Sequence, residues 1–226
     1  MFDKGFRLVA EIKKLEQGST AYIVGGAVRD FILGRECDDI DITTSVDIDI
    51  IEKHFPTHDI GNNKDFGILV VEFEGEAFEI ANYREDGDYS DGRRPDTVKI
   101  VPDFKDDAAR RDYTINAMGV DADGTIYDYF DGQKDIENKI IRTVGNAHTR
   151  FGEDHIRVLR GARFASRLGF TIEPDTLQAI KDFAGKIKEE PAERIMKEVF
   201  KMAKQGGDRF ADSIVMLREL GLLQHF

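Results

Sequence analysis

The stretch "GGAVRDFILGRECDDIDITTS", residues 25–45, joins a glycine pair, a short apolar segment and two aspartates one residue apart. A glycine pair that leads into a helix presents backbone N–H groups to a phosphate. Asp39 and Asp41 fall on a predicted strand, where residues two apart point to the same face. Two close carboxylates repel each other, and Mg²⁺ binds such pairs together with substrate phosphates. The stretch therefore predicts a phosphate-binding turn beside a metal site. The alternative is a solvated acidic surface, because residues 36–59 hold eight acids and one lysine.

The hydrophobic pattern around this stretch predicts an α+β fold followed by helices. Apolar residues at helical spacing predict an opening helix from residue 2 to 15, ended by Gly18. Strands are expected at 21–26 and 38–44, with a helix at 27–33 between them. Hairpins are expected to turn at Glu74-Gly75 and Asp123-Gly124, and residues 84–96 to form a mobile loop. Helices are expected at 152–170, 173–187, 191–205 and 208–226, which favours a separate helical part.

Composition excludes several classes of protein. The chain has 226 residues, a formal charge of −12 and a single cysteine, Cys37, so it cannot form an internal disulfide. The negative charge argues against sequence-independent adhesion to nucleic acid. No run approaches the roughly 20 apolar residues of a membrane helix. We therefore expect a soluble, cytoplasmic protein with no membrane partner. Its oligomeric state is left open.

A third carboxylate, Glu79, lies on the predicted strand 77–83. Its alternation with Phe78 and Ile80 fits a polar position facing the metal site, next to Asp39 and Asp41. An ordinary outward-facing residue would show the same pattern, and the residues do not decide between the two.

The motifs resemble one family. The stretch at 25–45 is similar to the signature of the class II nucleotidyltransferases, which include bacterial CCA-adding enzymes (tRNA nucleotidyltransferases) and poly(A) polymerases. "RRDYTINAMGVD" from Arg110, "EDHIRVLRGARFASRLGF" from Glu153 and "AERIMKEVFKM" from Ala192 follow in the family's order. Four ordered motifs make the resemblance specific. It implies a polymerase β-like head at 1–145 with a mixed sheet, an all-α neck at 146–205, and the start of a helical body domain at 206–226. Family members continue further, so the chain is expected to be a head and neck part, either truncated or an unusually short relative.

The resemblance also implies roles for residues. Asp39 and Asp41 would be the catalytic carboxylates that bind Mg²⁺, with Glu79 as a third ligand. Asp30 would help to shape the triphosphate and metal site. The implied nucleotide-binding residues are Gly25, Gly26, Arg29, Arg111, Asp112, Asn116, Asp154, Arg157, Arg160 and Arg163. Residues 83–96 would be the loop that helps CCA-adding members to switch from C to A addition.

The "EDHIR" motif would choose the nucleotide. Asp154 and Arg157, three residues apart on a predicted helix, would share a face and read the edge of cytosine or adenine. The alternative is an internal salt bridge in an acidic first turn. Six arginines between residues 142 and 170, against two acids, could hold a triphosphate or an RNA end. The alternative is that these arginines pair with acids elsewhere.

The function implied is addition of C, C and A to a tRNA 3′ end from CTP and ATP without a template. Attack of the RNA 3′-hydroxyl on the α-phosphate would release pyrophosphate, helped by Mg²⁺. The alternatives are a poly(A) polymerase, a CC- or A-adding relative, and a non-catalytic RNA- or nucleotide-binding module of the same fold. A small-molecule nucleotidyltransferase ranks last, because it is expected to lack the "EDHIR" helix.

Overall fold

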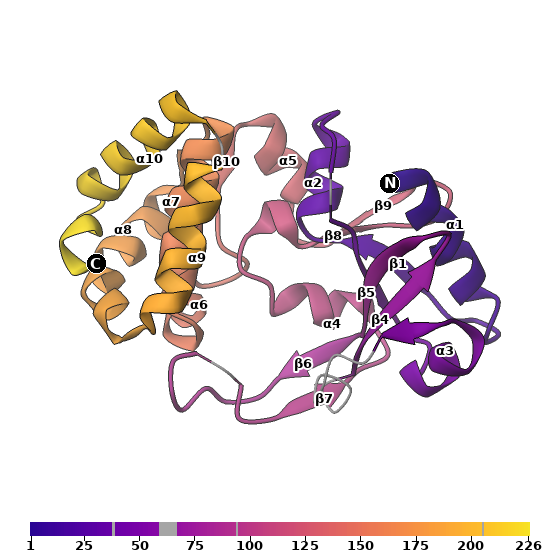
Figure 1. Cartoon of the computed structure of the whole chain (residues 1–226). Coiled ribbons are helices and arrows are strands. Elements are labelled where there is room, and N and C mark those ends of the chain that lie inside the picture. Colours follow the sequence, from indigo (N-terminus) through magenta and orange to yellow (C-terminus); the bar gives the residue numbers. More distant parts are fainter. Residues whose placement is uncertain (38, 59–66, 94, 205) are drawn as a thin grey trace. The chain divides into compact units, whose positions relative to one another are not determined.

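A computed structural model describes residues 1–37, 39–58, 67–93, 95–204 and 206–226. The described chain forms two compact units (Figure 1). The first unit comprises residues 1–86, 98–111 and 115–133, and the second comprises residues 87–97, 112–114 and 134–226. The division into head, neck and body that the sequence suggested stays a prediction.

The first unit is built on a seven-stranded mixed sheet in the order β3-β4-β5-β2-β1-β8-β9. Its strands are β1 (Ala21–Val24), β2 (Asp41–Thr44), β3 (Thr57–His58), β4 (Ile68–Phe73), β5 (Glu76–Asn82), β8 (Met118–Val120) and β9 (Ile126–Asp128). All neighbours pair antiparallel except β2 and β5, which are parallel. Because β2 and β5 run in the same direction, their corresponding ends lie at the same edge of the sheet. A separate hairpin joins β6 (Arg84–Asp86) and β7 (Val98–Ile100).

Helices cover this sheet. They are α1 (Phe2–Lys13), α2 (Gly26–Ile32), α3 (Ile48–His54) and α4 (Phe104–Ala109). Helix α1 packs on β1 and β2 and buries Leu8, Val9 and Ile12 completely. It approaches β1 closely at Gly5, where an added Cβ would lie 3.0 Å from the Ile23 side chain. The core of the unit therefore lies between α1 and the central strands.

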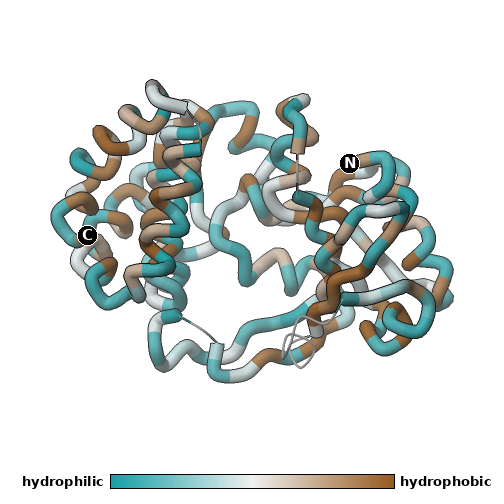
Figure 2. Tube along the Cα trace, viewed as in Figure 1, coloured by the Kyte–Doolittle hydropathy of each residue, from teal (hydrophilic) through white to brown (hydrophobic). Residues whose placement is uncertain are grey.

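The second unit is mainly helical. Its helices are α6 (Ala147–Glu153), α7 (Ile156–Leu168), α8 (Pro174–Phe183), α9 (Ala192–Ala203) and α10 (Gly207–Glu219), with 3₁₀ turns η3 (Ala184–Glu189) and η4 (Leu223–His225). Helix α7 is its core and packs against α9 and α10. Hydrophilic and hydrophobic segments alternate along α9 and α10, as expected for amphipathic helices (Figure 2). Helix α5 (Gly132–Glu137) and the 3₁₀ turn η2 (Thr114–Asn116) each include residues of both units.

Most predicted elements of the first unit are confirmed. The opening helix, the strand after it and the helix launched from the glycines all form. The hairpin between β4 and β5 turns at Glu74 and Gly75, whose φ angles of 50° and 77° suit a tight two-residue turn. The second hairpin joins β8 and β9, as expected. The α+β fold class is therefore confirmed.

Four local expectations were wrong. Strand β2 begins at Asp41, so Asp39 precedes the strand, and residue 38 lies outside the described residues. Residues 84–86 of the predicted loop form β6, and position 94 of that loop lies outside the described residues. The second unit also contains a short parallel pair, β10 (Ile140–Ile141) with β11 (Thr171–Ile172).

The fourth difference is in the predicted helix 152–170, which is broken between α6 and α7. Asp154 adopts an extended conformation with φ −147° and ψ 106°. Its carboxylate accepts a hydrogen bond from the backbone N–H of Ile156 at the start of α7. Aspartate side chains compete with the helix for backbone N–H groups, so they favour helix starts over helix interiors. Among the described residues, no helix is both long and apolar enough to cross a membrane.

Candidate active site

The first unit brings two of the predicted carboxylates together at the edge shared by β2 and β5. In the parallel register, Asp41 lies opposite Glu79. Neighbouring strands are about 4.8 Å apart, so the two side chains leave the sheet side by side. Both residues are exposed, whereas the next residues, Ile42 and Ile80, are buried. The alternation that suggested Glu79 as a third carboxylate therefore places it beside Asp41.

The electrostatics of this edge favour a cation. The pKa of Asp41 is raised to about 6, because surrounding protein atoms desolvate its carboxylate and because Asp39 and Glu79 repel its charge. Arg111 acts in the opposite direction. Because its pKa is raised, the ionised form of Asp41 is less favoured than that of an ordinary aspartate, and a nearby cation would stabilise it. Within the described ranges, no group of three or more His, Cys, Asp or Glu side chains is arranged to hold a metal ion. The oxygen donors of Asp39 and Asp41 still suit Mg²⁺, which binds through one or two carboxylates plus phosphates and water.

The glycine turn lies against the same carboxylate. Gly25 precedes α2 with φ 73° and ψ −141°, a conformation that favours glycine. A Cβ built at Gly25 would lie 3.6 Å from Nη1 of Arg111 and 4.0 Å from Oδ2 of Asp41. The turn, the carboxylate and the guanidinium therefore converge within the first unit.

Arg111 is anchored by Asp107. Its Nη2 donates to Oδ2 of Asp107 at 2.8 Å, and Asp107 is fully buried. Burial alone would raise the pKa of Asp107, but Arg111 and Arg110 lower it on balance. The buried Nε of Arg111 has no hydrogen-bond partner among the described residues. A guanidinium anchored in this way, with Nη1 beside the Gly25 turn, is suited to phosphate oxygens.

Arg29, Asp30 and Asn116 form a buried cluster beneath the glycine turn. Arg29 donates to both carboxylate oxygens of Asp30 at 3.0 Å and to Oδ1 of Asn116 at 2.8 Å. A Cβ at Gly26 would lie 3.3 Å from Nη2 of Arg29. The cluster ties α2 to the segment before β8. Contact of Arg29, Gly26 or Asn116 with nucleotide stays a prediction.

In the second unit, Asp112 is buried and ion-paired. It accepts from Nε of Arg160 at 2.6 Å and from the backbone N–H of Tyr113 at 2.8 Å. Its pKa is lowered to about 2, because the attraction of Arg160 and Arg157 outweighs the desolvation that would raise it. This carboxylate stays ionised at neutral pH.

Asp154 and Arg157 do not share one helix face, contrary to the prediction. Asp154 precedes α7 and accepts a bidentate pair of hydrogen bonds from Arg194 of α9, both 3.0 Å long. Arg157 donates to Oε2 of Glu153 at 2.6 Å. Each side chain is thus fixed by its own charged neighbour, while Asp154 keeps lone pairs that can accept from a base amine.

The predicted basic strip is largely neutralised by acids. Arg163 is 5% exposed and donates to Oε2 of Glu198 at 2.6 Å. Other partners are Asp135 for Arg142, Glu153 for Arg150 and Arg157, and Asp112 for Arg160. The alternative, that these arginines pair with acids elsewhere, describes Arg142, Arg160 and Arg163, whereas Arg150 and Arg157 pair with Glu153 inside the strip. Nucleotide contact by Arg160 and Arg163 stays a prediction.

Sequence reasoning assigned no role to Asp107 or Arg194, which orient the predicted site residues Arg111 and Asp154. The available signal was the i,i+4 spacing of opposite charges. Asp107 lies four residues before Arg111, with which it pairs, and Arg194 lies four residues after Glu190, to which it donates at 2.6 Å.

Comparison with known families assigns both parts of the chain. Residues 21–142 match the model of the "Poly A polymerase head domain". The chain belongs to the poly A polymerase head domain family. Residues 169–226 match a second model, the "Probable RNA and SrmB- binding site of polymerase A". The resemblance noted in the motifs is confirmed, and the candidate site residues Asp41, Glu79 and Arg111 all fall within the head-domain match.

Relatives of this head-domain protein include the CCA-adding enzyme of Geobacillus stearothermophilus, which is 42% identical over 98% of this chain and 54% of the relative. The crystal structure of Bacillus stearothermophilus CCA-adding enzyme in complex with CTP superposes with a TM-score of 0.84 at 39% identity, covering 98% of this chain and 52% of that one. A tRNA nucleotidyltransferase complexed with a primer tRNA and an incoming ATP analog has a TM-score of 0.78 at 32% identity, covering 96% and 61%. The chain spans about half the length of the curated relatives it matches.

Proposed function

We propose that this chain carries the catalytic part of an enzyme that adds C, C and A to a tRNA 3′ end from CTP and ATP. The observation that supports it most is that Asp41 and Arg111 both lie against Gly25 and that Glu79 pairs with Asp41 across β2 and β5. A carboxylate edge next to an anchored guanidinium is complementary to a metal-bound triphosphate. The relatives bound to CTP, to an ATP analog and to tRNA support the choice of substrates.

In the proposed reaction, the 3′-hydroxyl of the RNA attacks the α-phosphorus of the nucleotide, and the bond to pyrophosphate breaks. Gly25 and Arg111 bind the triphosphate and orient it. Asp39 and Asp41, with Glu79 beside them, would hold Mg²⁺. When bound, Mg²⁺ would supply charge neutralisation for the triphosphate and a lowered pKa for the attacking hydroxyl. Asp154 and Arg157 of the second unit are assigned to recognition of the base.

The test is incorporation of labelled CTP and ATP, separately and together, onto tRNA transcripts that lack the terminal CCA or only the final A. Ordered addition of C, C and A, abolished by Asp39→Ala/Asp41→Ala, is the expected result. Addition of A alone in long tails would instead indicate a poly(A) polymerase. Nucleotide binding without any incorporation would favour a binding module. Glu79→Gln is expected to weaken the activation by Mg²⁺, whereas Glu72→Gln on the neighbouring strand β4 is its matched control.

A further inference from the structure

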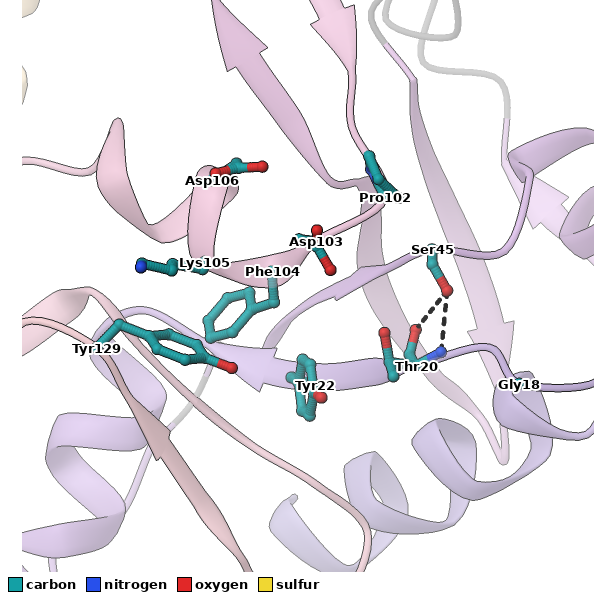
Figure 3. Close-up of a pocket in the computed structure, with 10 residues that line it drawn as sticks. All are labelled: Gly18, Thr20, Tyr22, Ser45, Pro102, Asp103, Phe104, Lys105, Asp106 and Tyr129. Atoms are coloured by element: carbon teal, nitrogen blue, oxygen red, sulfur yellow. Dashed lines mark hydrogen bonds between the residues drawn. The ribbon is translucent and has the colours of Figure 1, made fainter.

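A cavity of about 490 Å³ lies in the first unit, away from the carboxylate edge. Thr20 and Tyr22 line it at the start of β1, and Ser45 lines it just after β2 (Figure 3). In the register of these strands, Ala21 pairs with Thr44 at this end and Val24 pairs with Asp41 at the other. Three residues of strand separate the two ends, about 10 Å at 3.3 Å per residue. The cavity is therefore a separate site, about 10 Å along the strands from the proposed active site.

Aromatic rings form one wall of this cavity. The ring centroids of Tyr22 and Phe104 are 4.9 Å apart, and those of Phe104 and Tyr129 are 6.2 Å apart. Tyr22 and Phe104 are buried, but Tyr129 is 46% exposed. Figure 3 shows the three rings following one another along the cavity. The exposed face of Tyr129 offers its negative quadrupole to a ligand.

Acceptors dominate the polar part of the lining. Asp103 and Asp106 are exposed, and in the described part of the chain neither carboxylate has a hydrogen-bond or salt-bridge partner. Thr20 and Ser45 already bond to each other, since Ser45 Oγ accepts from the Thr20 N–H at 2.9 Å. Lys105 supplies the one ammonium of the lining, and Figure 3 shows it extending away from Thr20 and Ser45.

This combination selects for positive charge. Two unpaired carboxylates repel phosphates and other anions, so the cavity is not suited to a second nucleoside triphosphate. Aromatic faces attract ammonium groups, by about 0.5–1 kcal/mol at exposed sites. The chain's net charge of −12 adds a long-range attraction for cations. A cavity of this volume also falls within the usual range for small-molecule sites.

We propose that the cavity lined by Tyr22, Phe104 and Tyr129 with Asp103 and Asp106 binds a small organic cation, an amine or quaternary ammonium with an apolar body. The ammonium group lies against the Tyr129 ring and the two carboxylates, and the apolar body covers the aromatic wall. This inference does not depend on the proposed nucleotidyl transfer.

The test measures binding of tetramethylammonium and putrescine by calorimetry and by NMR of the tyrosine rings. The chain has six tyrosines and no tryptophan. The neutral tert-butanol, of similar size to tetramethylammonium, and inorganic phosphate serve as comparison ligands. We expect saturable binding of the cations, at least ten-fold weaker binding of tert-butanol, and none of phosphate. Tyr129→Ala and Asp103→Asn/Asp106→Asn should each weaken cation binding at least ten-fold, whereas Tyr129→Phe should retain it.

Two controls separate this cavity from other acidic places. Asp175→Asn/Glu219→Gln changes the net charge equally at exposed positions of the second unit and should leave binding unchanged. Asp39→Ala/Asp41→Ala should also leave it unchanged. The proposal is overturned if no cation binds saturably, if tert-butanol binds equally well, or if the Tyr129→Ala protein binds as the wild type does. It is also overturned if only the Asp39→Ala/Asp41→Ala variant loses binding, since the cation then occupies the proposed active site.

Discussion

Removal of Glu198 should destabilise the second unit strongly, because its partner Arg163 cannot reach water. The two side chains are 4% and 5% exposed and are joined by a 2.6 Å hydrogen bond from Nε to Oε2. Breaking a buried ion pair from one side costs about 3–5 kcal/mol, because an uncompensated charge remains. The Phe164 ring, 4.3 Å from the Arg163 guanidinium carbon, offsets part of that cost. We therefore expect Glu198→Ala to lower the free energy of unfolding by about 3 kcal/mol.

Urea unfolding followed by circular dichroism measures this loss. The matched control is Glu193→Ala on the same helix, whose salt bridge to Lys197 is exposed and should contribute nothing measurable. The double variant Arg163→Met/Glu198→Leu should recover most of the loss, because apolar side chains can replace a buried pair. A decrease of less than about 1 kcal/mol for Glu198→Ala would refute the reasoning.

The same pair predicts a pH dependence. Burial alone would raise the pKa of Glu198, but Arg163, Arg160 and Lys201 lower it on balance. A carboxyl with a lowered folded-state pKa stabilises the fold above its unfolded pKa, and this stabilisation is lost as the pH falls through the lower value. The difference between wild type and Glu198→Ala should therefore shrink below about pH 4. The nucleotide affinity of Arg163→Met/Glu198→Leu also tests whether Arg163 contacts nucleotide. Unchanged affinity would indicate that Arg163 has only a structural role.

Three further perturbations test other contacts. Asp41→Asn should stabilise the metal-free protein by about 1 kcal/mol, as measured by thermal unfolding. The raised pKa of Asp41 implies nearly 3 kcal/mol, and we reduce this value because solvent screens the charge. Gly92→Ala should weaken the contact between residue 92 and His155, because φ is 63° and a Cβ would lie 2.6 Å from the imidazole Cε1; faster hydrogen exchange at the His155 N–H, which donates to the Gly92 carbonyl, reports it. Gly161→Ala should cost about 1–3 kcal/mol in urea unfolding, because the added methyl would overlap the Tyr113 hydroxyl.

Each of these results has an outcome that contradicts it. Added Mg²⁺ should raise the melting temperature of the wild type but not of Asp41→Asn, and an equal rise in both would argue against a metal at Asp41. Gly124→Ala, at a glycine whose φ is also positive but whose Cβ would meet nothing within 4 Å, separates backbone strain from the contact with His155. Tyr113→Phe combined with Gly161→Ala should recover part of the lost stability, and no recovery would exclude the hydroxyl clash.

Local patterns predicted much of the fold because they depend on neighbouring residues. The apolar spacing of residues 2–12 requires a helix face, and Glu74-Gly75 readily adopts the positive φ angles that a tight hairpin needs. The break before α7 was missed because helical spacing continues through Asp154. The Asp154 carboxylate instead accepts the Ile156 N–H at the start of α7, and it also pairs with Arg194, forty residues further on.

The sequence alone indicated the family, the α+β fold class, the strands and helices around the glycine turn, and the candidates Asp39, Asp41 and Arg111. Only the tertiary structure decided that Glu79 lies beside Asp41, since strands paired in parallel must be brought together by a long crossover. It likewise decided that Arg163 is buried against Glu198 and that aromatic rings and unpaired aspartates meet around a cavity. Periodicity fixes which face of an element is apolar, but not which distant charge or ring that face will meet. Pairings across the fold depend on packing, and packing is settled only when the whole chain has folded.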